Sequence, residues 1–342
     1  MLKKQWILLL ILTLAVSVVL YGCGGTETGQ SVEQEGDQEA EGPQDTAAVD
    51  YPTRPIEMVV GWGAGGGTDN FARAIAAELE DLLGVTINVV NMEGSSEAVA
   101  GMYVQEQPAD GYTLYPTSNY TIAHANGLNP YGLDSYTPVA RIQADTATIQ
   151  VKAGGSFATI EELIDYAKEN PGQVSIGGTG AGAFDELTVR RFEQEAGIEL
   201  NYVPFEGAGE MHAALLGGHI DAQFEEFGPT IDYIRTEEII PLVVFAEERV
   251  DEFPDIPTTV EIGINLTDGL SRGIMVHGDT PQEIVEILEK ALEEAKDRPG
   301  YKEYEQNSFL HLREGWLNAE DYRALLAEQI ETYTEIIKSL EE

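Results

Sequence analysis

Cysteine and basic residues are both scarce in this chain, and each scarcity excludes something. Cys23 is the only cysteine among 342 residues, so no intrachain disulfide can form. Lysine and arginine number 19 against 60 aspartates and glutamates, which gives a formal net charge of −41. A chain this acidic repels nucleic acid and anionic lipid headgroups, so both are excluded as partners. Such charge is typical of proteins that stay soluble in concentrated salt, where ions screen the self-repulsion.

The N-terminal apolar run is too short for an ordinary membrane span. It covers the 15 residues Trp6–Leu20 behind the positive pair Lys3 and Lys4, whereas a spanning helix needs about 20 residues. The following Leu20-Tyr21-Gly22-Cys23 resembles the lipobox of bacterial lipoproteins, in which the cysteine becomes the lipidated first residue. We therefore predict a signal peptide over residues 1–22 and lipidation at Cys23. An uncleaved anchor helix is the alternative, and both place the rest of the chain outside the cytoplasmic membrane.

Residues 23–50 lack basic side chains and contain almost no large apolar ones. Eight acidic residues lie between Gly24 and Asp50. A segment of this composition cannot bury enough apolar surface to fold, and its charges repel one another. We predict an acidic disordered tether over residues 23–50 and a folded body from Tyr51 onward.

From Tyr51 the apolar pattern alternates between short strand-like runs and longer helical ones. Thr159 opens a capping box with Glu162, and Gly217-Gly218 ends a helix. The predicted strands are 56–60, 86–91, 112–117, 174–176, 200–203, 220–224 and 241–245, with 139–151 as one long extended segment. The predicted helices are 71–83, 97–107, 159–169, 185–196, 210–216, one opened at Thr280-Pro281, and one from Asn318 to the C-terminus. This alternation predicts α/β layers around mostly parallel sheets.

A glycine-rich turn, Gly61-Trp62-Gly63-Ala64-Gly65-Gly66-Gly67-Thr68-Asp69, separates the first predicted strand from the first predicted helix. Such a turn lets the backbone approach a ligand and aims N–H groups at it, which predicts an anion site. Val174–Asp185 repeats the order of strand, glycine loop and helix. Because ligands of open α/β sheets bind beyond the carboxyl ends of strands, two such loops suit two lobes that face one cleft.

The first turn also matches the dinucleotide pattern G-x-G-x-x-G at Gly61, Gly63 and Gly66. Two features count against a nucleotide. We expect the helix to start only after Gly67–Asn70, with Thr68 or Asp69 as its N-cap, and the second strand ends in Asn91 where an acid should hold the ribose. Neither a P-loop motif nor G-x-S-x-G occurs, and the five histidines have no metal-ligand spacing. We predict no catalytic residue, no metal and no cofactor.

The ordered motifs from Tyr51 to the C-terminus resemble the Bug family, the extracytoplasmic solute receptors of tripartite tricarboxylate transporters. The likeness opens at Tyr51-Pro52-Thr53-Arg54-Pro55-Ile56 and the glycine turn, and continues through Pro108–Leu114, Tyr202–Gly207, Leu216–Asp221 and Phe253–Thr258. It implies a two-lobed type II periplasmic-binding-protein fold with crossovers between lobes. We expect residues 51–145 plus 268–342 to form lobe 1 and residues 146–267 to form lobe 2.

The resemblance implies a monomeric receptor that closes on a small carboxylate and delivers it to a membrane permease. A receptor that feeds a sensor kinase and an extracytoplasmic enzyme are the alternatives. In the family, loop N–H groups and bridging water hold the carboxylate, and the candidate loops here contain no lysine or arginine. A helix N-terminus contributes about half a positive charge, which favours a carboxylate. The matching positions are Trp62, Ala64, Gly65, Gly66, Gly67, Thr68, Asp69, Ser118, Asn119, Thr179, Gly180, Ala181, Phe205 and Phe224. We add Glu225 as a further candidate ligand-binding residue.

Acidic residues mark two departures from the family. Asn91-Met92-Glu93-Gly94-Ser95-Ser96-Glu97 stands where the family usually has Asn-Arg-Pro-Gly-Ala-Gly-Gly, and Glu225 and Glu226 follow the strand 220–224. If these acids face the cleft, they favour a carboxylate whose other end is cationic or neutral, such as an amino acid or an amide. If they only add to the general acidity, a di- or tricarboxylate remains the expected ligand.

Overall fold

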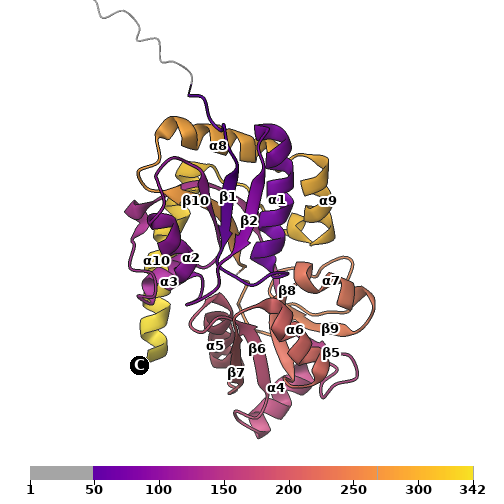
Figure 1. Ribbon diagram of the computed structural model, residues 1–342. Coiled ribbons are helices and arrows are strands. Elements are labelled where there is room, and N and C mark those ends of the chain that lie inside the picture. The colour runs from indigo at the N-terminus through magenta and orange to yellow at the C-terminus, as the bar shows by residue number, and fades with distance from the viewer. Residues whose placement is uncertain (1–48, 268, 342) are drawn as a thin grey trace, which may run out of the picture. The chain divides into compact units, whose positions relative to one another are not determined.

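The computed structural model describes residues 49–267 and 269–341, which form two five-stranded sheets with helices packed against them (Figure 1). The predicted signal peptide, the lipidation site Cys23 and nearly all of the predicted tether lie outside the described residues. In the described ranges, no helix has both the length and the apolar character that crossing a membrane requires.

The first sheet takes strands from both ends of the described chain, in the order β2-β1-β3-β10-β4. Strand β1 pairs in parallel with β2 and β3, whereas β10 runs antiparallel to β3 and β4. These strands are β1 (Ile56–Val60), β2 (Ile87–Asn91), β3 (Thr113–Thr117), β4 (Tyr136–Ala144) and β10 (Ser271–His277).

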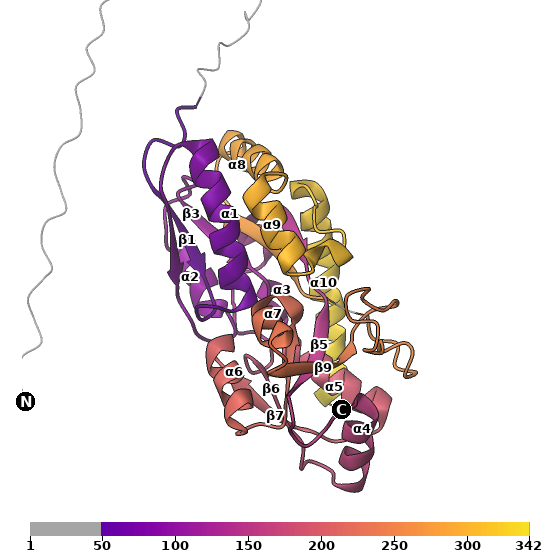
Figure 2. The ribbon, with the colours of Figure 1, turned by 90° about the vertical axis from the view of Figure 1, so that its right-hand side faces the viewer.

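Two groups of helices cover this sheet. Figure 2 shows α1 (Gly67–Leu83), α8 (Gln282–Ala295) and α9 (Pro299–Asn307) together along one face, where their apolar residues share a core with β1. The apolar residues of α2 (Ala98–Gln105), α3 (Tyr120–Ala125) and α10 (Ala319–Glu341) form a second cluster with β3 and β10.

The second sheet has the order β7-β6-β8-β5-β9. Strand β6 pairs in parallel with β7 and β8, while β5 runs antiparallel to β8 and β9. Helices α4 and α5 pack into one core cluster, and α6 and α7 into another. The elements are β5 (Ala147–Lys152), α4 (Ile160–Glu169), β6 (Ser175–Thr179), α5 (Phe184–Ala196), β7 (Asn201–Phe205), α6 (Ala208–Gly217), β8 (Ala222–Glu226), α7 (Phe227–Arg235) and β9 (Ile239–Val244).

The chain crosses from the first sheet to the second inside a segment that the sequence predicted to be one extended strand. The single extended segment 139–151 is wrong, because β4 ends at Ala144 in one sheet and β5 begins at Ala147 in the other. The chain returns between β9 and β10. Each sheet has one antiparallel strand next to a crossover, β10 in the first sheet and β5 in the second. The other four strands of each sheet run in one direction, so the prediction of mostly parallel sheets is confirmed.

Helix α1 begins earlier than the sequence predicted. Gly66 is its N-cap and Gly67 its first residue, so the helix starts directly behind the third glycine of G-x-G-x-x-G. Asp69 lies in the first turn, and its Oδ2 accepts a hydrogen bond from Gly65 N at 3.0 Å. One of the two arguments against a nucleotide is thus wrong. The other stands, because Asn91 ends β2 and donates to the Trp62 carbonyl at 2.9 Å.

Candidate functional site

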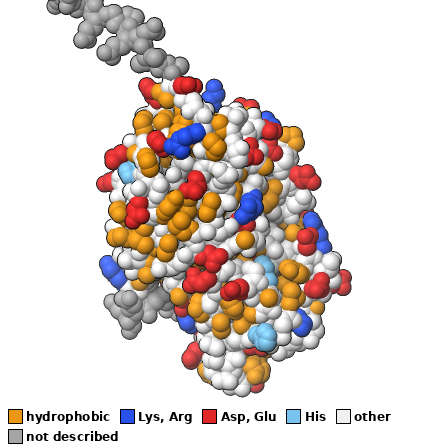
Figure 3. Space-filling model, in the orientation of Figure 1, with side chains coloured by type: hydrophobic (Ala, Val, Ile, Leu, Met, Phe, Trp, Pro, Cys, Tyr) orange, Lys and Arg blue, Asp and Glu red, His pale blue; other side chains and the backbone are white. Residues whose placement is uncertain are grey.

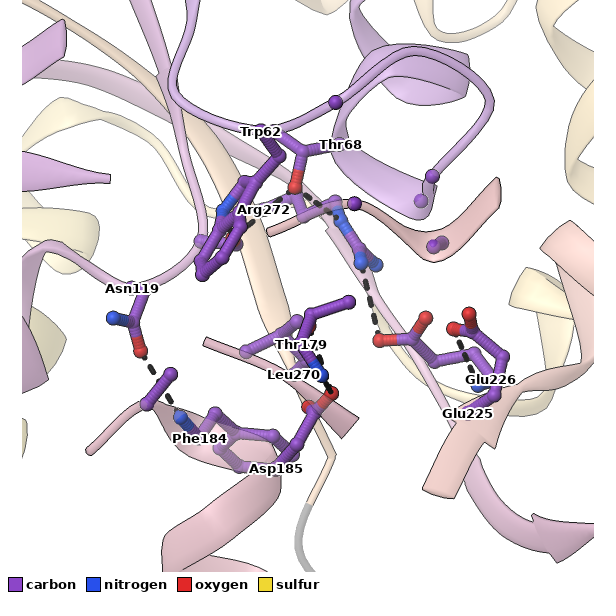
Figure 4. A pocket seen from close by; sticks show the side chains of 17 residues that line it. Trp62, Thr68, Asn119, Thr179, Phe184, Asp185, Glu225, Glu226, Leu270 and Arg272 are labelled. Atoms are coloured by element: carbon purple, nitrogen blue, oxygen red, sulfur yellow. Dashed lines mark hydrogen bonds and ion pairs between the residues drawn. The ribbon is translucent and has the colours of Figure 1, made fainter. Parts of the chain in front are cut away.

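A cavity of about 30 Å³ lies where loops of the two sheets meet (Figure 4). It is lined by the loops that follow β1, β3, β6 and β7 and by the last two residues of β8, so it opens at the carboxyl ends of strands, as expected for an α/β ligand site. The start of β10 closes its remaining side. The lining residues are Trp62, Gly63, Gly66, Gly67, Thr68, Ser118, Asn119, Thr179, Ala183, Phe184, Asp185, Gly207, Ala208, Glu225, Glu226, Leu270 and Arg272.

About half of the residues proposed from the sequence lie on this cavity. Those that line it are Trp62, Gly66, Gly67, Thr68, Ser118, Asn119, Thr179 and Glu225. Those outside its lining are Ala64, Gly65, Asp69, Gly180, Ala181, Phe205 and Phe224. Most of the second group supports the loops that form the cavity.

Asp69 and Phe224 illustrate these supporting positions. Asp69 is 2% exposed and pairs with Arg73 at 2.8 Å, besides holding Gly65 N. Burial opposes ionisation of this carboxyl, but the bonds from Arg73, Gly65 and Asn91 outweigh it and lower the pKa of Asp69. Phe224 packs in the core against Phe184 and Phe245. Asp69 therefore braces the glycine turn, and Phe224 supports the second sheet.

The indole of Trp62 is fixed from behind by a buried glutamate. Trp62 Nε1 donates to Glu97 Oε2 at 2.9 Å and to Ser118 Oγ at 3.0 Å. Glu97 is fully buried and also accepts from the Tyr115 hydroxyl at 2.8 Å and from Ser118 N at 3.0 Å. Glu97 thus orients one wall of the cavity without lining it. Glu93, the other acid of this segment, is exposed and also lies outside the lining.

Arg272 at the start of β10 is a buried cation of the cavity, and the sequence did not point to it. Its Nη1 pairs with Asp145, its Nη2 with Glu226 Oε1 at 3.1 Å, and its Nε donates to Thr68 Oγ1 at 3.1 Å. Burial alone would lower the pKa of Arg272, but the two carboxylates raise it. The guanidinium also lies against the glycine turn, because a Cβ on Gly67 would stand 2.2 Å from Nη2.

Four carboxyl groups surround that single guanidinium. Burial raises the pKa of Asp145 to about 7 despite its ion pair, and burial next to Glu226 raises the pKa of Asp185 to about 7. Burial and the neighbouring Glu226 raise the pKa of Glu225 well above its usual range. Burial also disfavours ionised Glu226, but Arg272 overcomes this and lowers its pKa. The pKa values of the two neighbouring acids of β8 are therefore shifted in opposite directions, which favours ionised Glu226 and protonated Glu225.

Glu225 lies next to a histidine that is neutral near pH 7. His212 Nε2 lies 2.9 Å from Glu225 Oε2, and burial lowers the pKa of His212 to about 4. The two side chains share one hydrogen bond, whose donor is set by the tautomer of His212 and the protonation of Glu225. Among the described residues, no group of three or more side chains is arranged to hold a metal ion.

Direct hydrogen bonds join the loops of the two sheets around the cavity. Asn119 Oδ1 accepts from Phe184 N at 3.1 Å, and Ser96 Oγ donates to the Ala181 carbonyl at 2.7 Å. Asp185 Oδ2 accepts from Thr179 N at 2.7 Å and fixes the second glycine loop. A volume of about 30 Å³ holds about one water molecule. A larger molecule can enter only when these loops separate.

Comparisons with known proteins agree with this architecture. A family model described as the tripartite tricarboxylate transporter family receptor matches residues 71–341. A UPF0065 protein in the gbd 5′ region of Cupriavidus necator is 28% identical over 302 residues, which cover 87% of this chain and 91% of that protein.

Two solved structures share the fold. The periplasmic binding protein BugD has a TM-score of 0.78 at 26% identity, over 84% of this chain and 98% of its own. MatC from Rhodopseudomonas palustris, solved with bound malate, has a TM-score of 0.76 at 24% identity, over 84% of this chain and all of its own. The predicted periplasmic-binding-protein fold and the resemblance to the Bug family are thus confirmed. This chain belongs to the tripartite tricarboxylate transporter receptor family.

Proposed function

We propose that this chain captures one small carboxylate in the cavity and delivers it to the membrane subunits of a tripartite tricarboxylate-type permease. The observation that carries the proposal is the convergence of the glycine turn at the N-terminus of α1, the loop before α5 and a buried arginine on one cavity. Helix N-termini and guanidinium groups are both suited to carboxylates. Family membership and the malate bound by MatC support the same ligand class.

The carboxylate accepts hydrogen bonds from the first turn of α1 in this proposal. Gly66 caps the helix without a side-chain hydrogen bond, which leaves the first N–H groups available for a ligand. Trp62, Ser118, Asn119 and Thr179 complete the contacts. Residues 51–145 plus 268–342 act as one lobe and residues 146–267 as the other, and they hinge at the crossovers.

We also propose an extracytoplasmic position, with acyl chains on Cys23 as the membrane anchor. Lipid-anchored receptors stay near their permease, and two acyl chains hold a protein far more firmly than one. Binding is the whole of the mechanism, so no ligand is turned over. Labelling with radioactive palmitate tests the anchor: the wild-type chain incorporates the label and Cys23→Ala does not.

A substitution at the N-cap of α1 tests the binding site. A Cβ on Gly66 would lie 3.4 Å from the Cβ of Ala208 in α6, so the protein accepts it, but the two γ-methyl groups of valine fill the space between the loops. We expect Gly66→Val to fold and to lose malate binding in titration calorimetry of the full-length chain.

Gly132→Val is the matched control. Gly132 precedes the short 3-10 helix Leu133–Ser135, and its φ of −75° and ψ of 174° are close to the −78° and 171° of Gly66. Its Cβ would meet only the His124 ring, at 3.9 Å. Small carboxylates that bind Gly66→Val as tightly as they bind Gly132→Val contradict the proposed site, and hydrolysis or conversion of the ligand contradicts a purely binding role.

A further inference from the structure

The charges around the cavity do not suit a ligand that is negative at both ends. Asp185, Glu225 and Glu226 line it together with Arg272, and all four side chains are at least nine-tenths buried. Asp145, 3% exposed, holds the far side of the guanidinium. The one cation is therefore already shared between two carboxylates, and a second ligand carboxylate would add to an acidic surface.

The acids are gathered on one side of the cavity. Figure 4 shows Glu225 and Glu226 at the end of β8 and Asp185 at the start of α5, opposite the glycine turn and Trp62. Acidic side chains are also spread over the outer face in Figure 3, but those exposed groups are solvated, whereas the acids of the cavity are buried. General surface acidity therefore does not explain them.

Asp185 also carries an oxygen that faces the cavity without a partner. Thr179 N and Thr179 Oγ1 both donate to Oδ2, at 2.7 and 2.8 Å. Among the described residues no donor reaches Oδ1. This oxygen remains accessible although the side chain is only 6% exposed, so it is available to accept a hydrogen bond from a ligand in the cavity.

We propose that the ligand is a small zwitterion, with its carboxylate on the N-terminus of α1 and an ammonium group between Asp185 and Glu226. This inference rests on the proposed function, because it names the far end of the same carboxylate ligand. Trp62, Phe184 and Leu270 supply apolar surface for a short alkyl chain between the two ends. Burial raises the pKa of Asp185 to about 7, so this carboxyl can release its proton near neutral pH as the ammonium group arrives.

Three probes of equal length and different terminal charge test the inference. Succinate, succinamate and γ-aminobutyrate carry a negative, neutral and positive far end, and titration calorimetry of the full-length chain at pH 8 measures their affinities. We expect γ-aminobutyrate to bind at least 10-fold more tightly than succinate, with succinamate between them. The series is repeated one carbon longer, with glutarate, glutaramate and 5-aminopentanoate.

Two substitutions test whether the acids of the cavity cause the preference for γ-aminobutyrate over succinate. Glu226→Gln and Asp185→Asn each narrow or reverse the preference for γ-aminobutyrate, whereas Glu252→Gln, which removes an exposed acid outside the cavity, leaves it unchanged. Thermal unfolding checks that each variant is folded. If one of the two cavity variants does not fold, the other alone tests the inference.

The outcomes separate the two proposals. If succinate binds more tightly than γ-aminobutyrate, or if malate binds and none of the zwitterions does, this inference is overturned and the proposed function is left intact. Absence of binding by every carboxylate, malate included, overturns the proposed function and this inference with it.

Discussion

Asp185→Asn should change the pH dependence of stability by an amount that the structure allows us to work out. Burial raises the pKa of Asp185 from 3.8 to about 7, so the folded state holds this proton more tightly than the unfolded state. The stability that the proton contributes is fully present below about pH 4 and is lost as the pH rises through 7. An asparagine, which cannot ionise, does not lose it.

The size of the effect follows from the pH range in which only the unfolded state is ionised. Between pH 5 and 7 the folded Asp185 stays mostly protonated, and each pH unit there corresponds to about 1.4 kcal/mol. Between pH 5 and pH 8, the difference in the free energy of unfolding between Asp185→Asn and the wild type should therefore shift by about 2 to 3 kcal/mol in favour of the variant.

Urea unfolding of the ligand-free protein at pH 5, 6, 7 and 8 measures this difference. Asp251→Asn is the control, because it removes the same charge from an exposed position. A difference between Asp185→Asn and wild type that does not change with pH would refute the reasoning. It would mean that Asp185 is ionised in the folded state throughout, and that the cavity carries one more negative charge.

Three further substitutions test the parts of the cavity. Gly67→Ala places a Cβ 2.2 Å from Arg272 Nη2, so we expect a loss of about 1–3 kcal/mol in urea unfolding; unchanged stability would show that the guanidinium moves freely. Arg272→Met leaves two buried carboxylates without their cation and should cost about 3–5 kcal/mol at pH 8, with a smaller loss at pH 5 where they bind protons. Trp62→Phe removes the bonds from Nε1 to Glu97 and Ser118 and should cost about 1–3 kcal/mol in thermal or urea unfolding, an effect absent if water replaces the indole nitrogen.

The loops of the cavity could be predicted because glycine marks them. The turn before α1 and the loop before α5 each follow a short apolar strand, and helix N-termini at such places are visible in the sequence. Strand alternation could have refined the prediction at β8. Neighbouring residues of a strand point to opposite faces, so Phe224 and Glu225 are expected on opposite sides of β8. The alternation does not extend to Glu226, the last residue of β8, which also lines the cavity. The structure places Phe224 in the core and Glu225 on the cavity.

The contribution of Arg272 could not be predicted in the same way. It is a single basic residue in an apolar strand, and its partners Asp145 and Glu226 lie 127 and 46 residues away in the chain. Only the crossover after β4 brings Asp145 to the start of β10. That crossover lies inside the run 139–151, in which apolar residues on both sides of it make the sequence look like one strand. Local periodicity carries no information on where a chain changes sheets.

Native mass spectrometry of the full-length chain, mixed with malate and γ-aminobutyrate, tests the central claim most directly. The account predicts one small carboxylate bound per chain, retained in Gly132→Val and lost in Gly66→Val. A chain that binds neither compound, or a Gly66→Val variant that binds as the control does, would contradict the claim that the loops of the two sheets close on a carboxylate.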